Sequence, residues 1–207
     1  MRRLASTTAA FLAAVVLAGC QPAAPPATPT SSPTSEPAST APVPTPTYLC
    51  TPEAGGDEAP CSQLEYDEMK AKDELYAEAE AVYRRMFAEN IRVSRSGGLN
   101  EPSQVILETT AGQAQSSLME IFRDLHSNGL QARGSDPTLQ IERAAGLSKE
   151  GSIVALLVCV DASQWAFYQG SNLVSKGRPA QDRVYFSRLH DALKMTYVEG
   201  RWVDLCE

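Results

Sequence analysis

The amino-acid sequence predicts an α+β fold, in which N-terminal helices pack on a curved antiparallel sheet. Three observations lead to this prediction. Two segments with helical periodicity, residues 62–90 and 112–127, come first along the chain. The segments with strand patterns all follow residue 130, and turn signals separate them. Helices followed by consecutive strands are typical of α+β domains, in which neighbouring strands run antiparallel.

The N-terminus predicts export from the cytoplasm. Arg2 and Arg3 precede the uncharged, mostly apolar residues 4–18, which is the pattern of a secretory signal peptide. A permanent membrane helix needs roughly 20 apolar residues, so this segment is too short to remain as one. The predicted signal peptide comprises residues 1–19.

The letters LAGC at residues 17–20 follow the apolar segment, and they resemble the lipobox of bacterial lipoprotein precursors. The resemblance implies cleavage before Cys20, whose thiol then carries a diacylglyceryl group. One acyl chain anchors a protein only marginally, so stable attachment needs two or three chains. The chain is therefore expected to be extracytoplasmic and lipid-anchored through Cys20 to the outer face of the cell membrane. An ordinary secretory signal with an incidental cysteine is the alternative.

Residues 20–47 predict a linker between the anchor and the folded part. Apart from Cys20, they are almost all Pro, Ala, Ser and Thr, a composition that cannot bury enough apolar surface to fold. Proline-rich linkers extend by about 3.1 Å per residue, so we expect a disordered stalk of up to roughly 80 Å. Residues 48–207 are then expected to form a single globular domain.

The charge distribution excludes two classes of partner. The formal net charge is −7, and the chain has no run of Lys or Arg. Nucleic acids and anionic lipid surfaces attract basic patches, so neither is an expected partner. The sequence also lacks the motifs of phosphate-binding loops, nucleophile elbows and zinc hydrolases, and no cofactor is expected.

Four cysteines remain after Cys20. In an exported domain they indicate two disulfides, with three possible connectivities. Cys50 and Cys61 flank a turn-rich loop before the first helix, which favours a local bridge. Cys159 ends an apolar strand and Cys206 follows the last strand, so their pairing would pin the C-terminus to the sheet. A metal site is the alternative, but the chain has no CxxC spacing and only two histidines.

Ser62 begins the first predicted helix. Ser62 and Glu65 form the S-x-x-E pattern of a capping box, and the helix is expected to continue to about Asn90 with one apolar face. The letters RSGGLNEPS interrupt it, and a short helical segment is expected at residues 104–107. The second helix covers residues 112–127.

Strand patterns occupy the C-terminal part of the chain. Residues 138–144 alternate between apolar and polar side chains, as in a half-buried strand. Residues 152–160 are almost continuously apolar, which indicates a central strand buried on both faces. Residues 183–190 and 192–198 predict two strands or one long bulged strand.

The letters EG at Glu199 and Gly200 predict the turn of a last hairpin. Such a two-residue turn would join the preceding strand to residues 201–206. Tyr197 would then lie opposite Trp202 as a cross-strand aromatic pair.

The order of these elements, with the letters YVEGRWV near the end, resembles the nuclear transport factor 2-like (cystatin-like) fold. The letters GLQARG, CVD after an apolar strand, and EGRWV also resemble small secreted lipoproteins of actinobacteria. The resemblance covers about residues 64–207, and it implies a cone formed by helix and sheet. Enzymes with this fold place an acid or base inside the cone, whereas other members are non-catalytic, so function must be argued from the site.

The candidates for a site in the cone are Asp161, Trp165, Tyr168, Tyr185, His190 and Asp204. Asp161 directly follows the central strand, where burial would raise its pKa and suit it to act as a general base. We favour the interpretation that Asp161 instead caps the turn that begins there. His190 and Asp191 are adjacent, so on a strand they would point to opposite faces and form no dyad.

Trp165, Tyr168 and Tyr185 are candidates for lining a pocket that takes a small hydrophobic ligand. Ordinary packing in the core or at a strand edge is the interpretation that we favour for these aromatic residues. The sequence therefore contains no combination of residues that by itself indicates catalysis.

Together, these patterns favour a membrane-anchored cell-envelope lipoprotein that presents a non-catalytic binding domain on a stalk. Its expected partners are the membrane, through Cys20, and an envelope protein or a small hydrophobic ligand. The first alternative is a ketosteroid-isomerase-like or SnoaL-like enzyme with Asp161 as its acid or base. The second is a surface-exclusion lipoprotein.

Overall fold

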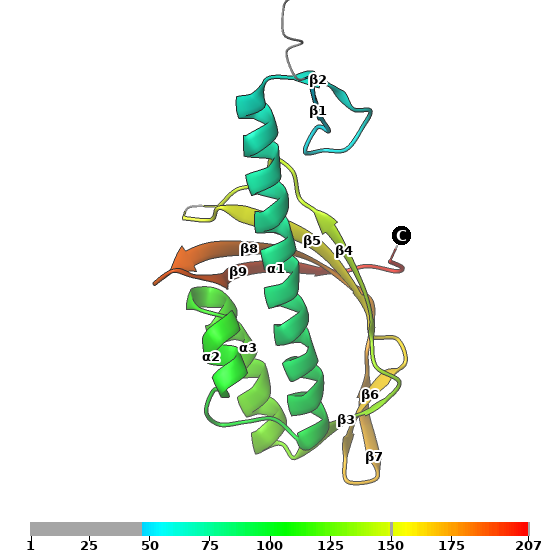
Figure 1. The fold of residues 1–207 in the computed structure, drawn as a ribbon. Helices are drawn as coiled ribbons and strands as arrows, with labels where there is room; N and C mark the ends of the chain where they lie inside the picture. Colours follow the sequence, from blue (N-terminus) through cyan, green and yellow to red (C-terminus); the bar gives the residue numbers. More distant parts are fainter. Residues whose placement is uncertain (1–46, 150, 207) are drawn as a thin grey trace, which may run out of the picture. The chain divides into compact units, whose positions relative to one another are not determined.

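The computed structural model describes residues 47–149 and 151–206 of the chain (Figure 1). The predicted signal peptide, Cys20 and nearly all of the predicted linker lie outside the described residues. What the sequence indicates about them, and about the boundaries between signal, linker and domain, stays a prediction.

The described chain begins with a small hairpin. Strand β1 (Tyr48–Cys50) pairs antiparallel with β2 (Ala59–Cys61). A disulfide joins Cys50 to Cys61 and closes the loop between the two strands, which is the local bridge expected from the sequence. The hairpin contacts the helix that follows it and lies beside the N-terminal end of that helix (Figure 1).

That helix, α1 (Gln63–Ser96), begins with the predicted capping box. The hydroxyl of Ser62 accepts a hydrogen bond from the backbone N–H of Glu65 at 3.3 Å, and the Glu65 carboxylate accepts one from the N–H of Ser62 at 2.7 Å. The helix continues past its expected end at Asn90, because the first residue that stops it is Gly97, in the left-handed conformation with φ 92°. Among the described residues, no helix is both long and apolar enough to cross a membrane.

Two shorter helices lie beside α1 (Figure 1). Helix α2 (Gln104–Thr109) extends slightly beyond the segment predicted for it, and α3 (Gly112–Ser127) has the predicted bounds. The backbone N–H of Leu99 donates to the carbonyl of Phe122 at 3.2 Å, which ties the segment after α1 to α3. The three helices therefore form one layer.

The remaining strands form two antiparallel sheets. The first contains, in spatial order, β4 (Thr138–Arg143), β5 (Val154–Asp161), β8 (Ala180–Leu189) and β9 (Ala192–Trp202). The second contains β3 (Leu130–Gly134), β6 (Trp165–Gln169) and β7 (Asn172–Lys176). The α+β prediction is confirmed, since a long N-terminal helix packs against antiparallel sheets that do not close into a barrel within the described residues.

The predicted turn at Glu199 and Gly200 is wrong. Strand β9 runs without a break through both residues, and the turn between β8 and β9 consists of His190 and Asp191, with φ 49° and φ 65°. Two successive residues with positive φ form the type I′ turn, whose twist matches that of the flanking strands. Further along the hairpin the register shifts by one residue between Tyr185 and Phe186, as at a β-bulge. Tyr197 therefore pairs with Tyr185 rather than with Trp202.

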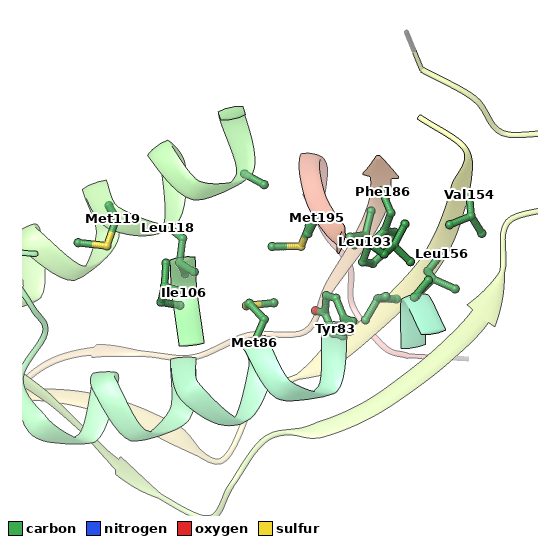
Figure 2. Packing of buried hydrophobic residues seen from close by; sticks show 14 of the residues in the cluster. Tyr83, Met86, Ile106, Leu118, Met119, Val154, Leu156, Phe186, Leu193 and Met195 are labelled. Atoms are coloured by element: carbon green, nitrogen blue, oxygen red, sulfur yellow. The ribbon is translucent and has the colours of Figure 1, made fainter. Parts of the chain in front are cut away.

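The core lies between the helices and one face of the four-stranded sheet, which we call the inner face (Figure 2). Most of its side chains are at most 5% exposed, including Tyr83, Met86, Ile106, Phe122, Val154, Leu156, Val184, Phe186, Leu193 and Met195. Phe122 and Phe186 have no exposed surface. Side chains therefore fill the middle of the inner face, and the opposite surface of the sheet is its outer face.

Candidate functional site

One carboxylate shares the inner face with the core. Side chains two residues apart on a strand point to the same side, so Asp182 of β8 lies on the same face as the buried Val184 and Phe186. Its neighbours across the sheet are Val158 on β5 and Gly200 on β9. Asp182 therefore continues the row of inward-pointing side chains towards the start of β8.

Gly200 makes room for this carboxylate. A Cβ atom placed on Gly200 would lie 2.5 Å from Oδ1 of Asp182, which is far inside the ordinary contact distance of carbon and oxygen. The carboxylate therefore lies directly over the backbone of Gly200, in a space that any other residue would occupy. This close approach explains a glycine in the interior of β9, where glycine otherwise weakens a strand.

The electrostatic environment of Asp182 is unusual for a carboxylate. Burial raises its pKa to about 6, and no hydrogen bond or cation among the described residues acts to lower it. Burial also raises the pKa of the Tyr83 hydroxyl on α1, and the negative charge of Asp182 raises it further. Asp182 is consequently a partly desolvated anion at neutral pH that lacks a counter-ion within the described structure.

A small cavity opens beside this carboxylate. Its volume is about 270 Å³, and it is lined by Ala180, Asp182, Gly200, Arg201 and Trp202. Trp202 lies on the same side of β9 as Gly200, and it is 65% exposed. The Arg201 side chain donates a hydrogen bond to Oε1 of Gln181 at 2.6 Å, and alternation places both residues on the outer face. We call this the Asp182 cavity.

An aromatic ring that attracts cations forms one wall of the Asp182 cavity. The guanidinium carbon of Arg178 lies 4.8 Å from the centroid of the Trp202 ring, within the range of a cation–π interaction. An anion, an exposed indole and open space therefore meet at one margin of the sheet. Such a combination can accept hydrogen bonds, bind a cation or take up a proton.

Asp161 does not reach the inner face. Along β5, Asp161 points to the same side as Ala155 and Leu157, which pack on the outer face. The core residue Val158 points to the other side. Its carboxylate accepts a hydrogen bond from the backbone N–H of Ser163 at 2.9 Å, and this bond lowers its pKa. The raised pKa considered for a general base at Asp161 is therefore wrong, and the structure shows the turn-capping arrangement instead.

The three aromatic pocket candidates do not come together. Trp165 and Phe167 share one face of β6, with ring centroids 6.0 Å apart. Tyr168 points to the other face, where the Arg133 guanidinium carbon lies 4.8 Å from its ring centroid. The indole N–H of Trp165 is buried and has no hydrogen-bond partner in the described part of the chain. These residues pack within the three-stranded sheet.

Tyr185 lies on the outer face of the four-stranded sheet, so it does not line the cone. Its ring makes an edge contact with Tyr197 at 6.2 Å, and its hydroxyl donates to Oε2 of Glu199 at 3.2 Å. Lys149 pairs with Glu199 and lies 3.6 Å from the centroid of Tyr197. These four side chains form what we call the outer-face cluster, in which each charge has a partner.

The remaining candidates lie away from the Asp182 cavity. His190 and Asp191 are the two turn residues between β8 and β9 rather than strand residues. Asp204 is exposed after the end of β9. A disulfide joins Cys159 to Cys206, which is the second pair favoured from the sequence. Within the described ranges, no group of three or more His, Cys, Asp or Glu side chains is arranged to hold a metal ion.

A second, larger hollow lies between the N-terminal hairpin, the start of α1 and β4. Its volume is about 1030 Å³. The rings of Tyr48 and Tyr66 lie 5.3 Å apart on its wall. An ion pair of 2.6 Å joins Arg143 of β4 to Asp73 of α1, and the Tyr76 hydroxyl donates to Glu53 at 2.5 Å. These contacts hold the hairpin against α1 and β4, so the hollow is a structural junction.

The sequence analysis did not single out Asp182. The pattern that could have identified it is the alternation in the letters AQDRVYF, in which Asp182 points to the same side as Val184 and Phe186. Because a turn was predicted at Glu199 and Gly200, β9 was not expected to continue there, and Gly200 was interpreted as a turn residue rather than as the partner of Asp182. The alternation alone marks Asp182 as the one carboxylate in phase with the core of β8.

Comparisons with known proteins add little to this site. No family model and no curated protein matches the chain. Among solved structures, the intermembrane space region of the chloroplast protein ARC6 is similar with a TM-score of 0.43 and 15% sequence identity, over 61% of this chain and 95% of that chain. A likeness at this level establishes neither family nor function.

Proposed function

We propose that this chain is a membrane-anchored cell-envelope lipoprotein whose folded domain is a non-catalytic binding domain presented on a stalk. One observation carries the binding role. Side chains such as Phe122, Phe186 and Met195 fill the middle of the inner face, whereas open space remains at its margin, in the Asp182 cavity. A ligand or partner is therefore recognised at the surface of the domain.

The disulfides support a location outside the cytoplasm. The described part of the structure contains two, Cys50–Cys61 and Cys159–Cys206. Disulfides form and persist in oxidising compartments and are rare in the cytosol. This agrees with the secretory pattern at residues 1–19.

The anchor is supported by the sequence pattern that ends at Cys20. A direct test is metabolic labelling of the full chain with an alkyne-bearing fatty acid in a bacterial host that processes lipoproteins. We expect label and membrane association for the natural chain, and loss of both for Cys20→Ala. The matched control is Cys20→Ala with an added transmembrane helix, which should return to the membrane without label. A labelled Cys20→Ala chain would contradict the anchor.

The binding role is tested by photo-crosslinking in intact cells. A photoreactive phenylalanine analogue replaces Trp202 at the Asp182 cavity or, as a matched exposed control, Val174 on β7. We expect a discrete adduct from position 202 and none from position 174. Equal adducts at both positions, or none at either, would contradict a binding site at the cavity.

A second candidate function is favoured by the pKa of Asp182. A carboxylate with a pKa of about 6, beside the buried Tyr83, suits the acid or base of a ketosteroid-isomerase-like enzyme better than Asp161 does. Exchange of the α-protons of a β,γ-unsaturated ketone in D₂O, followed by NMR, tests it. An enzyme should accelerate the exchange through Asp182 and not through Asp161. No acceleration above buffer removes this candidate.

A further inference from the structure

The Asp182 cavity offers an anion that has no counter-ion in the described structure. Asp182 is held on the apolar inner face by its strand register, and Gly200 supplies the space for its carboxylate. A partly buried charge is costly unless a partner of opposite charge or a hydrogen-bond donor compensates it. The Asp182 oxygens are not among the fully buried polar atoms that lack a partner, so the donor that compensates this charge is water or a ligand in the cavity.

The cations nearest in the sheet do not fill this role. The Arg201 side chain is bonded to Gln181 on the outer face. Arg183, the next residue of β8, also points outward by alternation. Arg178 lies over the Trp202 ring. None of the three lowers the pKa of Asp182.

The walls of the cavity indicate which body a cationic ligand of Asp182 would carry. The Trp202 ring is largely exposed. Ala180 and Gly200, which have small or no side chains, form the apolar floor of the cavity. The volume of about 270 Å³ is below the range of roughly 300–1,000 Å³ that is typical of sites for drug-sized ligands. The space thus suits one short apolar body that carries a positive charge.

We propose that the Asp182 cavity binds a primary ammonium group carried on a short aliphatic or aromatic body, with Asp182 as its counter-ion and Trp202 as its apolar wall. This inference rests on the proposed binding function and names the chemical class of its ligand. The same ammonium chemistry occurs in free amines and in the lysine side chain of a peptide. The experiment distinguishes these two sources.

The test is a titration of the purified full chain followed by the indole N–H signals in ¹H–¹⁵N NMR spectra. The chain has two tryptophans, so Trp202 reports on the cavity and the buried Trp165 serves as an internal control. The probes are n-butylamine and phenethylamine, with n-butanol and 2-phenylethanol as neutral analogues. We expect the amines to shift the Trp202 signal in a saturable manner, while the alcohols and the Trp165 signal show no such change.

Two matched variants assign the binding to the carboxylate. Asp182→Asn keeps the shape and removes the charge, and it should weaken amine binding by about 10- to 100-fold, as expected for the loss of a charge-assisted hydrogen bond. Asp161→Asn removes a carboxylate from the outer face of the same sheet and should leave the affinity unchanged. Equal loss in both variants, or no loss in Asp182→Asn, overturns the proposal, as does the absence of a saturable shift with either amine.

The source of the ammonium group is settled by a comparison of n-butylamine with N-acetyl-lysine amide and a lysine-containing tripeptide. Tighter binding of the peptides assigns the cavity to a lysine of a partner protein, and tighter binding of the free amine assigns it to a small metabolite. If no amine binds while residue 202 still gives a crosslink in cells, the inference fails and the proposed function stands. If amines bind but the chain is neither labelled nor crosslinked, the proposed function fails and the amine site stands.

Discussion

The two faces of the four-stranded sheet treat charge in opposite ways. On the outer face, Lys149 and Glu199 pair with each other, and the Tyr185 hydroxyl adds a hydrogen bond to Glu199. On the inner face, Asp182 lies beside apolar side chains without a counter-ion among the described residues. Apart from Lys149, both arrangements are built from side chains of β8 and β9. The difference teaches that strand register, rather than local composition, decides which charge is structural and which is free to bind.

The largest expected effect comes from the inner face. Phe186→Ala removes a ring with no exposed surface and should lower the free energy of unfolding by about 3–5 kcal/mol, because a cavity remains in the packed core. Ser187→Ala, one residue along β8, is the matched control and should change it by less than about 1.5 kcal/mol. Urea unfolding with the disulfides intact measures both. Similar losses in the two variants would contradict the assignment of the faces.

Loss of the Cys159–Cys206 disulfide should have the next largest effect on stability. Cys159 and Cys206 are 47 residues apart in sequence, so replacing both with Ser should cost about 4 kcal/mol of stability by the loop-entropy estimate. The shorter loop of Cys50–Cys61, with a separation of 11 residues, should cost about 3 kcal/mol. Thermal unfolding of the two double variants gives their order. A larger loss for the hairpin pair would contradict this ranking.

Asp182→Asn should stabilise the domain at neutral pH, by about 2 kcal/mol. The folded-state pKa of about 6 lies above the unfolded value of about 3.9, so the folded state holds its proton more tightly. This contribution is fully present below about pH 4 and is lost as the pH rises through 6. Unfolding curves between pH 3 and 8 should therefore show a decline in the natural chain that the variant lacks. An identical pH dependence would contradict the burial of Asp182.

The outer-face cluster should give the smallest effect. Lys149 and Glu199 are both substantially exposed, and water and salt screen such pairs. The pairing lowers the pKa of Glu199, chiefly through its hydrogen bond with Lys149, so its contribution is present at neutral pH and is lost on acidification. Glu199→Gln should shift the urea midpoint less than Phe186→Ala, the two disulfide variants or Asp182→Asn, and 1 M salt should reduce that shift further. A shift larger than that of Asp182→Asn would reverse the comparison between the faces.

Local patterns predicted much of this fold. The capping box at Ser62 and Glu65 begins α1, and α3 has the bounds that its apolar period indicates. These features depend on interactions within a few residues, so composition and spacing are enough to find them. The end of α1 was placed too early because residues 91–96 carry no clear apolar face, although no helix-breaking residue precedes Gly97.

The candidate site was the part that sequence reasoning missed. Asp161 was singled out because it follows the central strand, yet its phase on β5 places it on the outer face. Asp182 was overlooked because its environment is created by a residue that comes much later in the chain. Only the pairing of β8 with β9 brings Gly200 opposite it.

The sequence by itself determined the class of fold, the helix starts, the two favoured cysteine pairs and the expectation of export with a lipid anchor at Cys20. Each of these depends on short-range patterns or on the chemistry of single residues. The tertiary structure alone decided the turn at His190 and Asp191 and the register shift between Tyr185 and Phe186. The turn alone would pair Asp182 with Glu199. Because a one-residue shift changes the partner of every side chain that follows, the turn and the shift together place Gly200 beneath Asp182 at the edge of the cavity.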